Sequence, residues 1–201
     1  MPTYKLDVFV TDAWPYELKQ AVYSLCIAKK VNSSYSVVWT AMQDYEFYNE
    51  FRWEDSYKLG TIQMFEDGKN LVKMAAGKKQ PVTFGQTVVR DHKGILNVAT
   101  GAPSGKPSFT LQNEGGPTFP IVDQLFNNEF KTSWSASLGM IYGYVSLELR
   151  PKVLIFFQKG MKTGDMFATI PGAVCEIDFT GVTEKAVSFV TSGSQRGGDM
   201  G

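Results

Sequence analysis

Alternation of apolar and polar side chains begins at the start of the chain. Along residues 4–11 every second side chain faces one apolar side: Tyr4, Leu6, Val8 and Val10. A period of two residues is typical of a strand with one buried face. Asp12 follows and can cap a short helix over residues 15–20, because an acidic side chain satisfies free N–H groups and proline is tolerated in the first turn. The pattern predicts an N-terminal strand and then one short helix.

Further stretches alternate in the same way, or are briefly apolar, between turn-forming residues. They cover residues 21–30, 34–42, 57–65, 70–75, 84–89, 108–112, 131–137, 142–150, 152–158, 173–180 and 186–191. Asp67 and Gly68 supply turn chemistry that predicts a hairpin between residues 57–65 and 70–75. The unbroken apolar run of residues 153–157 favours a central strand covered on both faces. Apolar pairs four residues apart predict one or two helical turns over residues 120–126.

Short strands at this spacing predict an all-β fold, an antiparallel β-sandwich with one or two short helices. A chain of 201 residues buries one sizeable core, and neither a linker nor an internal repeat divides it. We therefore expect a single domain over residues 1–191. Residues 192–201 are mostly Gly, Ser and polar residues, which predicts a disordered tail.

Composition narrows the classes of function. Lys plus Arg and Asp plus Glu both number 20, so the net charge is zero and the basic footprint of a nucleic-acid-binding protein is absent. No apolar run approaches the roughly 20 residues of a transmembrane helix. The first residues do not resemble a secretory leader, which predicts a cytoplasmic location. Cys26 and Cys175 are too few for a disulfide scaffold, so we expect two buried, reduced thiols.

Candidate catalytic chemistry is sparse. The single histidine, His92, lies in a polar turn, which argues against a histidine-rich metal site and against a catalytic triad. Gly101 to Lys106 is one residue short of a phosphate-binding loop, and Pro107 replaces the hydroxyl residue that such a loop needs. We therefore expect a protein that is not an enzyme and holds no metal. Five carboxylates could form a glycosidase-type pair or a charged rim, and the sequence leaves both open: Asp44, Glu46, Glu50, Glu54 and Asp55.

Aromatic residues are concentrated in residues 45–57. As a strand, this segment places four rings on one face: Tyr45, Phe47, Phe51 and Trp53. Two interpretations remain open, since such a wall either fills the core or forms a platform for a flat apolar ligand. The candidate ligand-binding residues are Trp39, Tyr45, Tyr48, Phe51 and Trp53, joined by Trp14, Trp134 and Tyr142.

Two segments carry a resemblance to known proteins. Residues 3–11 (TYKLDVFVT) and 32–42 (NSSYSVVWTAM) resemble the first strands of the fungal fruit-body lectins and the related actinoporin-like β-sandwich proteins, over about the first quarter of the chain. This resemblance implies a β-sandwich that binds glycans or membranes. In size, aromatic richness and lack of catalytic residues the chain is also similar to the pigment-carrying chromoproteins of oyster mushroom fruit bodies, which implies a bound chromophore.

The interpretation we favour is a binding protein that holds an apolar or conjugated small molecule, such as a pigment chromophore, in an aromatic-lined pocket. A glycan-binding lectin is the alternative, because sugars stack on Trp or Tyr rings and loops such as residues 113–116 offer hydrogen-bonding groups. A membrane-active, actinoporin-like protein is the third, although the strand predicted at the N-terminus counts against it. Zero net charge and an aromatic-rich sheet also predict a homodimer.

Overall fold

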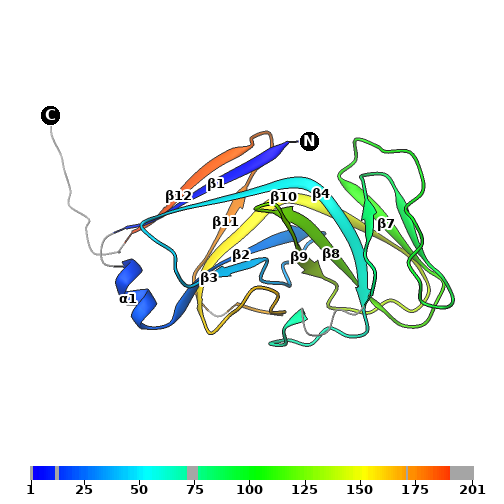
Figure 1. Cartoon of the computed structure of the whole chain (residues 1–201), viewed down its shortest axis with the longest axis horizontal. Helices are drawn as coiled ribbons and strands as arrows, with labels where there is room; N and C mark the ends of the chain where they lie inside the picture. The colour runs from blue at the N-terminus through cyan, green and yellow to red at the C-terminus, as the bar shows by residue number, and fades with distance from the viewer. Residues whose placement is uncertain (1, 12–13, 72–76, 171, 191–201) are drawn as a thin grey trace.

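The computed structural model describes residues 2–11, 14–71, 77–170 and 172–190, which form two sheets and one helix (Figure 1). The first sheet has the order β12–β1–β4–β8–β9, with β5 paired to β4. Its strands are β1 (Thr3–Val10), β4 (Tyr48–Ile62), β5 (Gln80–Val82), β8 (Phe119–Phe126), β9 (Glu129–Ser135) and β12 (Glu184–Phe189). The second sheet has the order β3–β2–β10–β7–β6, with β11 paired to β10. Its strands are β2 (Tyr23–Val31), β3 (Thr40–Met42), β6 (Thr87–Arg90), β7 (Ser108–Asn113), β10 (Gly143–Lys159) and β11 (Val174–Asp178).

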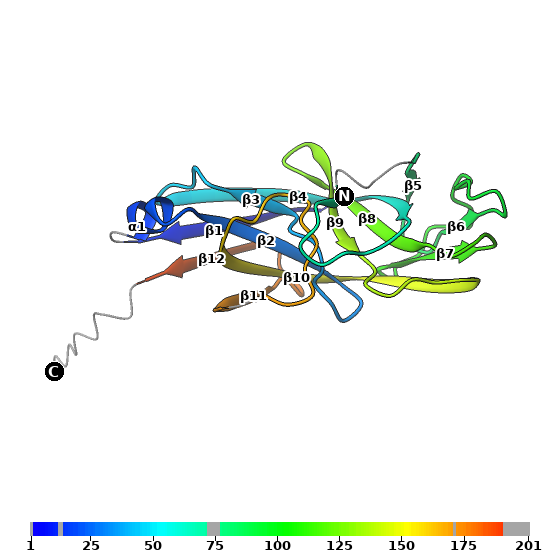
Figure 2. The same ribbon diagram turned by 90° about the horizontal axis from the view of Figure 1, so that it is seen from below.

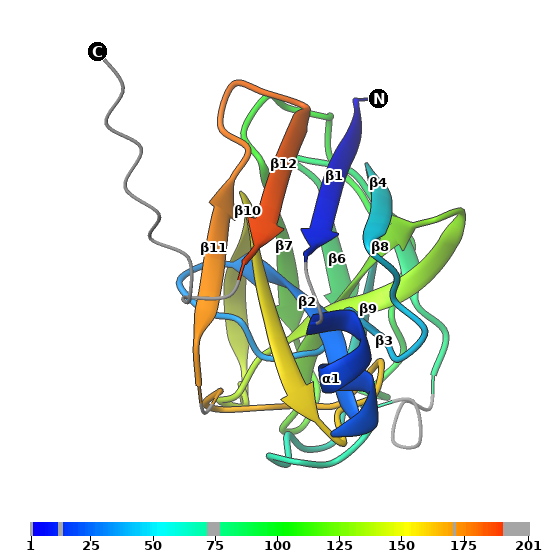
Figure 3. The ribbon, with the colours of Figure 1, turned by 90° about the vertical axis from the view of Figure 1, so that its left-hand side faces the viewer.

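The described part of the molecule is elongated. Helix α1 (Trp14–Gln20) lies at one end, and β6 and β7 lie at the other (Figure 2). Seen from the α1 end, β1, β12 and β11 stand in a row, although β11 belongs to the second sheet (Figure 3). The chain therefore crosses from one sheet to the other between β11 and β12.

Most strand predictions are confirmed, as is the helix predicted over residues 15–20. The apolar run of residues 153–157 lies in β10, which has neighbours on both sides and buries Val153 and Phe156 on opposite faces. Both cysteines are free, Cys26 buried and Cys175 half-buried. The expected cap Asp12 and the tail of residues 192–201 lie outside the described residues.

Several predictions are wrong. Residues 120–126 lie in β8, between β4 and β9, and form no helix. Apolar side chains four apart also share one face of a strand, so their spacing did not separate the two structures. Residues 142–150 and 152–158 form one strand, β10, rather than two. The predicted all-β, sandwich-like fold itself is confirmed, although β1 pairs with β12, and β6 with β7, in parallel rather than antiparallel.

The hairpin predicted around Asp67 and Gly68 is also wrong for the described residues. The turn itself forms, with a left-handed φ of 76° at Gly68. After it, however, the Leu71 amide donates to the carbonyl of Gly164, so the chain leaves β4 for a different segment. Residues 72–75 of the predicted strand lie outside the described residues. Strand β4 pairs instead with β1, β5 and β8.

Two apolar clusters fill the space between the sheets. The first includes Leu6, Ile27 and Trp53 toward the α1 end. The second includes Val31 and Tyr57 toward β6 and β7. The division between the two clusters falls along β2 and β4, which contribute residues to both.

Candidate functional site

Four of the predicted ligand-binding rings lie in the first apolar cluster. Trp39, Tyr45 and Phe51 have no exposed surface, and Trp53 is 2% exposed. Trp39 contacts Trp53 edge-on, with the ring centroids 5.7 Å apart. The structure therefore places these rings as core packing, and a ligand-binding role for them stays a prediction.

The other predicted rings are dispersed over the molecule. The Tyr48 ring is 46% exposed, and its hydroxyl donates to Asp7 at 2.9 Å. Trp14 packs half-buried beside the first cluster, whereas Trp134 belongs to the second. Tyr142 is 76% exposed. These residues do not form one site.

The face predicted for residues 45–57 also needs correction. Strand β4 begins only at Tyr48, so Phe47 precedes it and is exposed instead of buried with Phe51. Of the predicted carboxylates, Glu50 pairs with Arg52 at 2.6 Å and Glu46 with Lys19 at 3.1 Å, as expected for a charged rim. Asp55 differs, because it is half-buried and its carboxylate accepts hydrogen bonds from the hydroxyls of Tyr4 and Tyr57.

A buried lysine separates the two apolar clusters. Along the inner face of β2 the side chains run Leu25, Ile27, Lys29 and Val31. Strand geometry forces this placement, since alternate residues share a face. Lys29 is 4% exposed. Its neighbour Lys30 lies on the opposite face and pairs with Glu176 at 3.0 Å.

Lys29 borders a cavity of about 250 Å³, the Lys29 cavity. Its walls include Tyr4, Lys29, Asp55, Tyr57, Phe84 and Phe179. The exposed residues Arg150, Thr180 and Gly181 also border the cavity, so it reaches the surface. It is thus a partly open space between the sheets with one buried amine beside it.

The wall opposite Lys29 is polar. Tyr57 donates to one oxygen of Asp55 at 2.7 Å, and Tyr4 donates to the other at 3.2 Å. Gln124 donates to the Tyr57 hydroxyl at 3.2 Å, and its own carbonyl oxygen is buried without a partner among the described residues. Asp55 is therefore held by two hydroxyl donors, and no ion pair within 4.0 Å joins it to Lys29.

Aromatic rings bound the same space. Tyr4 stacks on Trp53 with the ring centroids 5.7 Å apart, and Phe179 meets both rings edge-on. The Lys29 ammonium lies 6.0 Å from the centroid of the Trp53 ring. Within the described residues, this ring contact is the only direct interaction found for the ammonium, and no hydrogen bond reaches it.

Burial sets the protonation of these groups. It lowers the pKa of Lys29 to about 8, and the charge of Asp55 offsets part of the effect. Burial, with a smaller contribution from Asp55, raises the pKa of Tyr4 to about 12 and that of Tyr57 well above its usual value. The tyrosines therefore stay protonated and donate to Asp55, while part of the Lys29 population is a neutral amine near neutral pH.

Both sheets have a shift in strand register next to the Lys29 cavity. The pairing of β4 with β8 shifts register between Trp53 and Tyr57. The pairing of β10 with β2 shifts between Leu149 and Val153, around Pro151. Such bulges bend strands and re-aim side chains, and they are common next to binding sites. Here they flank the residues that line the Lys29 cavity.

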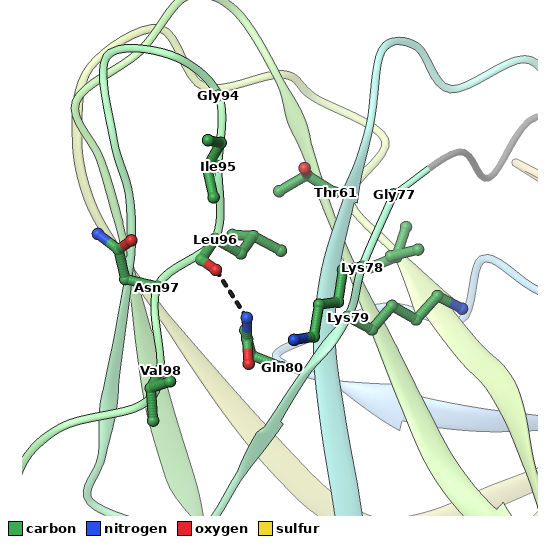
Figure 4. Close-up of a pocket in the computed structure, with 11 residues that line it drawn as sticks. Thr61, Gly77, Lys78, Lys79, Gln80, Gly94, Ile95, Leu96, Asn97 and Val98 are labelled. Carbon is green, nitrogen blue, oxygen red and sulfur yellow. Dashed lines mark hydrogen bonds between the residues drawn. The ribbon is translucent and has the colours of Figure 1, made fainter.

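At least four other hollows lie elsewhere, and two of them show the contrast with the Lys29 cavity. An apolar cleft of about 530 Å³ is lined by Trp14, Tyr23, Phe157 and Phe189. A second hollow, of about 480 Å³, lies between residues 77–80 and 94–98, where Gln80 donates to the carbonyl of Leu96 at 2.7 Å (Figure 4). Neither has a buried charge without an ion-pair partner on its walls, which is why we take the Lys29 cavity as the candidate site.

Comparisons of the chain with known proteins found no relative. Neither the models of known protein families, nor curated proteins, nor solved structures match the chain. Within the described residues, no three His, Cys, Asp or Glu side chains gather as a metal site. No helix in that part of the chain is long and apolar enough to cross a bilayer.

The pattern of the sequence contained a clue to Lys29 that the expectation of an aromatic site overlooked. In residues 25–31 strict alternation places a lysine on the apolar side of the strand. The same alternation, continued from Phe51 and Trp53, places Asp55 on the inner face of β4. A charged residue in such a row marks either a polar pocket or a paired ion.

Proposed function

We propose that this protein binds a small aromatic or conjugated molecule, without transforming it, in the Lys29 cavity. One observation carries the proposal: a buried amine with no hydrogen-bond partner in the described residues borders a partly open space walled by aromatic rings. Ligand sites are mostly apolar, with a few convergent polar groups that orient the ligand. A cavity of about 150 Å³ accommodates benzene, so about 250 Å³ accommodates a substituted ring.

The tryptophans allow a direct test with benzyl alcohol as the probe. Each indole N–H gives its own NMR signal, and single Trp→Phe variants assign them. Binding in the Lys29 cavity should shift the Trp53 signal, since Trp53 stacks on a ring that lines the cavity. The Trp14 signal reports on the apolar cleft. A shift confined to Trp14 would move the ligand to that cleft, and no shift at any tryptophan would contradict the proposal.

Exposed tyrosines favour a glycan as a second candidate ligand. Tyr142 and Tyr144 are largely exposed, and sugars stack on exposed rings. The test is binding to a panel of immobilised glycans, compared between the parent protein and a Tyr142→Ala, Tyr144→Ala double variant. Glycan binding that the double variant loses would support this candidate, and no binding by the parent would reject it.

The predicted homodimer remains a proposal and is tested separately. Leu138, Ile141 and Tyr142 are all largely exposed within residues 138–142, and exposed apolar patches tend to associate. Light scattering at micromolar concentration should give twice the 22.3 kDa mass of one chain. A mass equal to that of a single chain would exclude the dimer.

A further inference from the structure

Lys29 lies in an otherwise apolar row on the inner face of β2. Its neighbours along the inner face of β2, Ile27 and Val31, are fully buried and apolar. A buried ammonium without hydrogen bonds is costly, so lysines in such positions are usually paired or have a chemical role. The ring of Trp53 gives partial compensation at 6.0 Å. A role for the amine in binding accounts for its position.

Asp55 lies across the cavity but does not neutralise the lysine directly. Both carboxylate oxygens are occupied by tyrosine hydroxyls, at 2.7 Å from Tyr57 and 3.2 Å from Tyr4. This arrangement orients the carboxylate and leaves the amine free to react. The negative charge still lies near enough to stabilise a cation formed at the Lys29 nitrogen.

We infer that Lys29 captures the carbonyl carbon of an aromatic aldehyde as an imine, which makes the bound ligand covalently attached and reversibly released. The inference rests on the proposed binding function and specifies its ligand class. It follows from the unpaired amine, the adjoining cavity and the ring-lined walls, which together fit a flat molecule carrying one reactive carbonyl group.

The chemistry needs no partner beyond the aldehyde. The neutral Lys29 amine adds to the carbonyl carbon, forming a carbon–nitrogen bond and a carbinolamine. One amine hydrogen has by then moved to the former carbonyl oxygen, which is now a hydroxyl group. The carbinolamine loses this hydroxyl group together with the remaining hydrogen of the nitrogen as one water molecule, and a carbon–nitrogen double bond remains. A proton taken up by the imine nitrogen gives an iminium cation, and Asp55 stabilises its charge. Hydrolysis reverses each step and releases the aldehyde.

The protonation state of Lys29 favours this reaction near neutral pH. A pKa of about 8 leaves roughly a tenth of the amine neutral at about pH 7, against well under a thousandth for a lysine in water. The raised pKa values of Tyr4 and Tyr57 keep their hydroxyls protonated, so they remain donors to Asp55.

Reductive trapping with benzaldehyde tests the inference on the intact chain. Sodium cyanoborohydride reduces an imine to a stable benzylamine, and peptide mass spectrometry locates the added benzyl group. With limiting reagent we expect at least about tenfold more label on Lys29 than on Lys30, because the Lys30 ammonium is held in an ion pair with Glu176. Lys30 is a matched internal control, because it is adjacent in the strand but on the opposite face.

Two variants complete the experiment. Lys29→Met should lose the rapid labelling, whereas Lys30→Met should keep it, with circular dichroism confirming that both fold. Label spread evenly over surface lysines, or absent from Lys29 in the folded parent protein, would overturn the inference. Should Lys29→Met fail to fold, labelling of the parent protein at Lys29 and Lys30 still decides.

The two proposals fail in different ways. If benzyl alcohol shifts the Trp53 signal but benzaldehyde leaves Lys29 unmodified, the cavity binds aromatic rings and the imine is wrong. If benzyl alcohol has no effect while Lys29 is selectively labelled, the amine is reactive and the affinity of the cavity for aromatic rings is wrong. If neither occurs, both proposals are wrong.

Discussion

Two lysines lie near aspartates in this sandwich, in opposite states of pairing. Lys79 lies 2.7 Å from both oxygens of Asp123, and Thr132 donates to the same carboxylate at 2.6 Å. Lys29 has neither an ion pair nor a hydrogen bond among the described residues, and the tyrosines occupy the oxygens of Asp55. In the first site the ammonium is fully paired with the carboxylate, whereas the second retains an unpaired amine beside a cavity.

This difference in pairing distinguishes a lysine that stabilises the fold from a lysine that is available to a ligand. An ion pair in which both partners are fully hydrogen-bonded stabilises the fold and leaves no charged group free to bind a ligand. An amine left unpaired lowers stability and is retained where it serves binding or chemistry. The two sites should therefore respond in opposite directions when each lysine is replaced by methionine, a residue of similar length without charge.

The largest expected effect is at the fully paired site. Lys79→Met leaves the Asp123 carboxylate, whose side chain is largely buried, with only Thr132 as a donor. We expect the free energy of unfolding to fall by about 3 kcal/mol, measured by urea denaturation at neutral pH. The adjacent, exposed Lys78 is the control, and Lys78→Met should change stability by less than about 0.5 kcal/mol. Equal effects of the two variants would refute the assignment of a structural ion pair.

Replacing the unpaired lysine should have the opposite sign. Lys29→Met removes a buried ammonium and extends the apolar row of β2, so we expect the free energy of unfolding to rise by about 2 to 3 kcal/mol at neutral pH. The control, Lys30→Met, loses a surface ion pair with Glu176 and a contact with the Tyr35 ring, and should cost less than about 1 kcal/mol. A marked loss of stability in Lys29→Met would show that its amine has a structural partner.

The pH dependence of stability sharpens the contrast. The folded-state pKa of Lys29 is about 8, below the ordinary value of 10.5, so the unfolded chain binds more protons between these values. Stability is therefore penalised below about pH 8 and recovers as pH rises, because the folded amine loses its proton first.

Relative to Lys29→Met, the parent protein should gain about 2 kcal/mol between about pH 7 and about pH 10. Of the other cavity groups, Tyr4 and Tyr57 keep their protons in this window, and Arg150 lies at the exposed border of the cavity. Asp55 is the remaining charged group that faces the amine. Urea denaturation at several pH values measures the gain, and parallel stability profiles of the two proteins would exclude a depressed lysine pKa.

The smallest expected effect concerns the donors that hold Asp55. Tyr4→Phe removes the longer of the two hydrogen bonds to the carboxylate and should lower stability by about 1 kcal/mol. Tyr144→Phe, at a largely exposed ring, is the matched control and should have no measurable effect. If thermal denaturation gives equal midpoints for the two variants, Tyr4 does not orient Asp55.

The sequence could predict features that depend on local pattern, and it could not predict features that depend on pairing between segments distant in sequence. Alternation found most strands because it depends only on neighbours along the chain, as in residues 4–11. It could not find the return of residues 69–71 to the segment of Gly164, or place residues 120–126 between β4 and β9, since both depend on contacts distant in sequence.

The candidate site also depends partly on local pattern, which the sequence shows, and partly on long-range pairing, which it does not. Alternation alone places Lys29 and Asp55 on apolar faces. That these two faces meet, with Tyr4 between them and Trp53 alongside, depends on strand order and on the register shifts in β4 and β10. Core packing of Trp39 and Trp53 was one of the two interpretations left open by the sequence, and the structure places both rings there.

The parallel pairing of β1 with β12 has a consequence for how the chain folds. Lys5 is aligned with Glu184 and Val10 with Phe189. The outer edge of β1 therefore stays uncovered until β12, the last described strand, has been added. Joining two strands so far apart in sequence costs conformational entropy before their contacts stabilise the protein. Proteins rich in such distant pairings fold slowly. During synthesis, β1 would leave the ribosome with a bare edge open to other chains until residues 184–189 emerge.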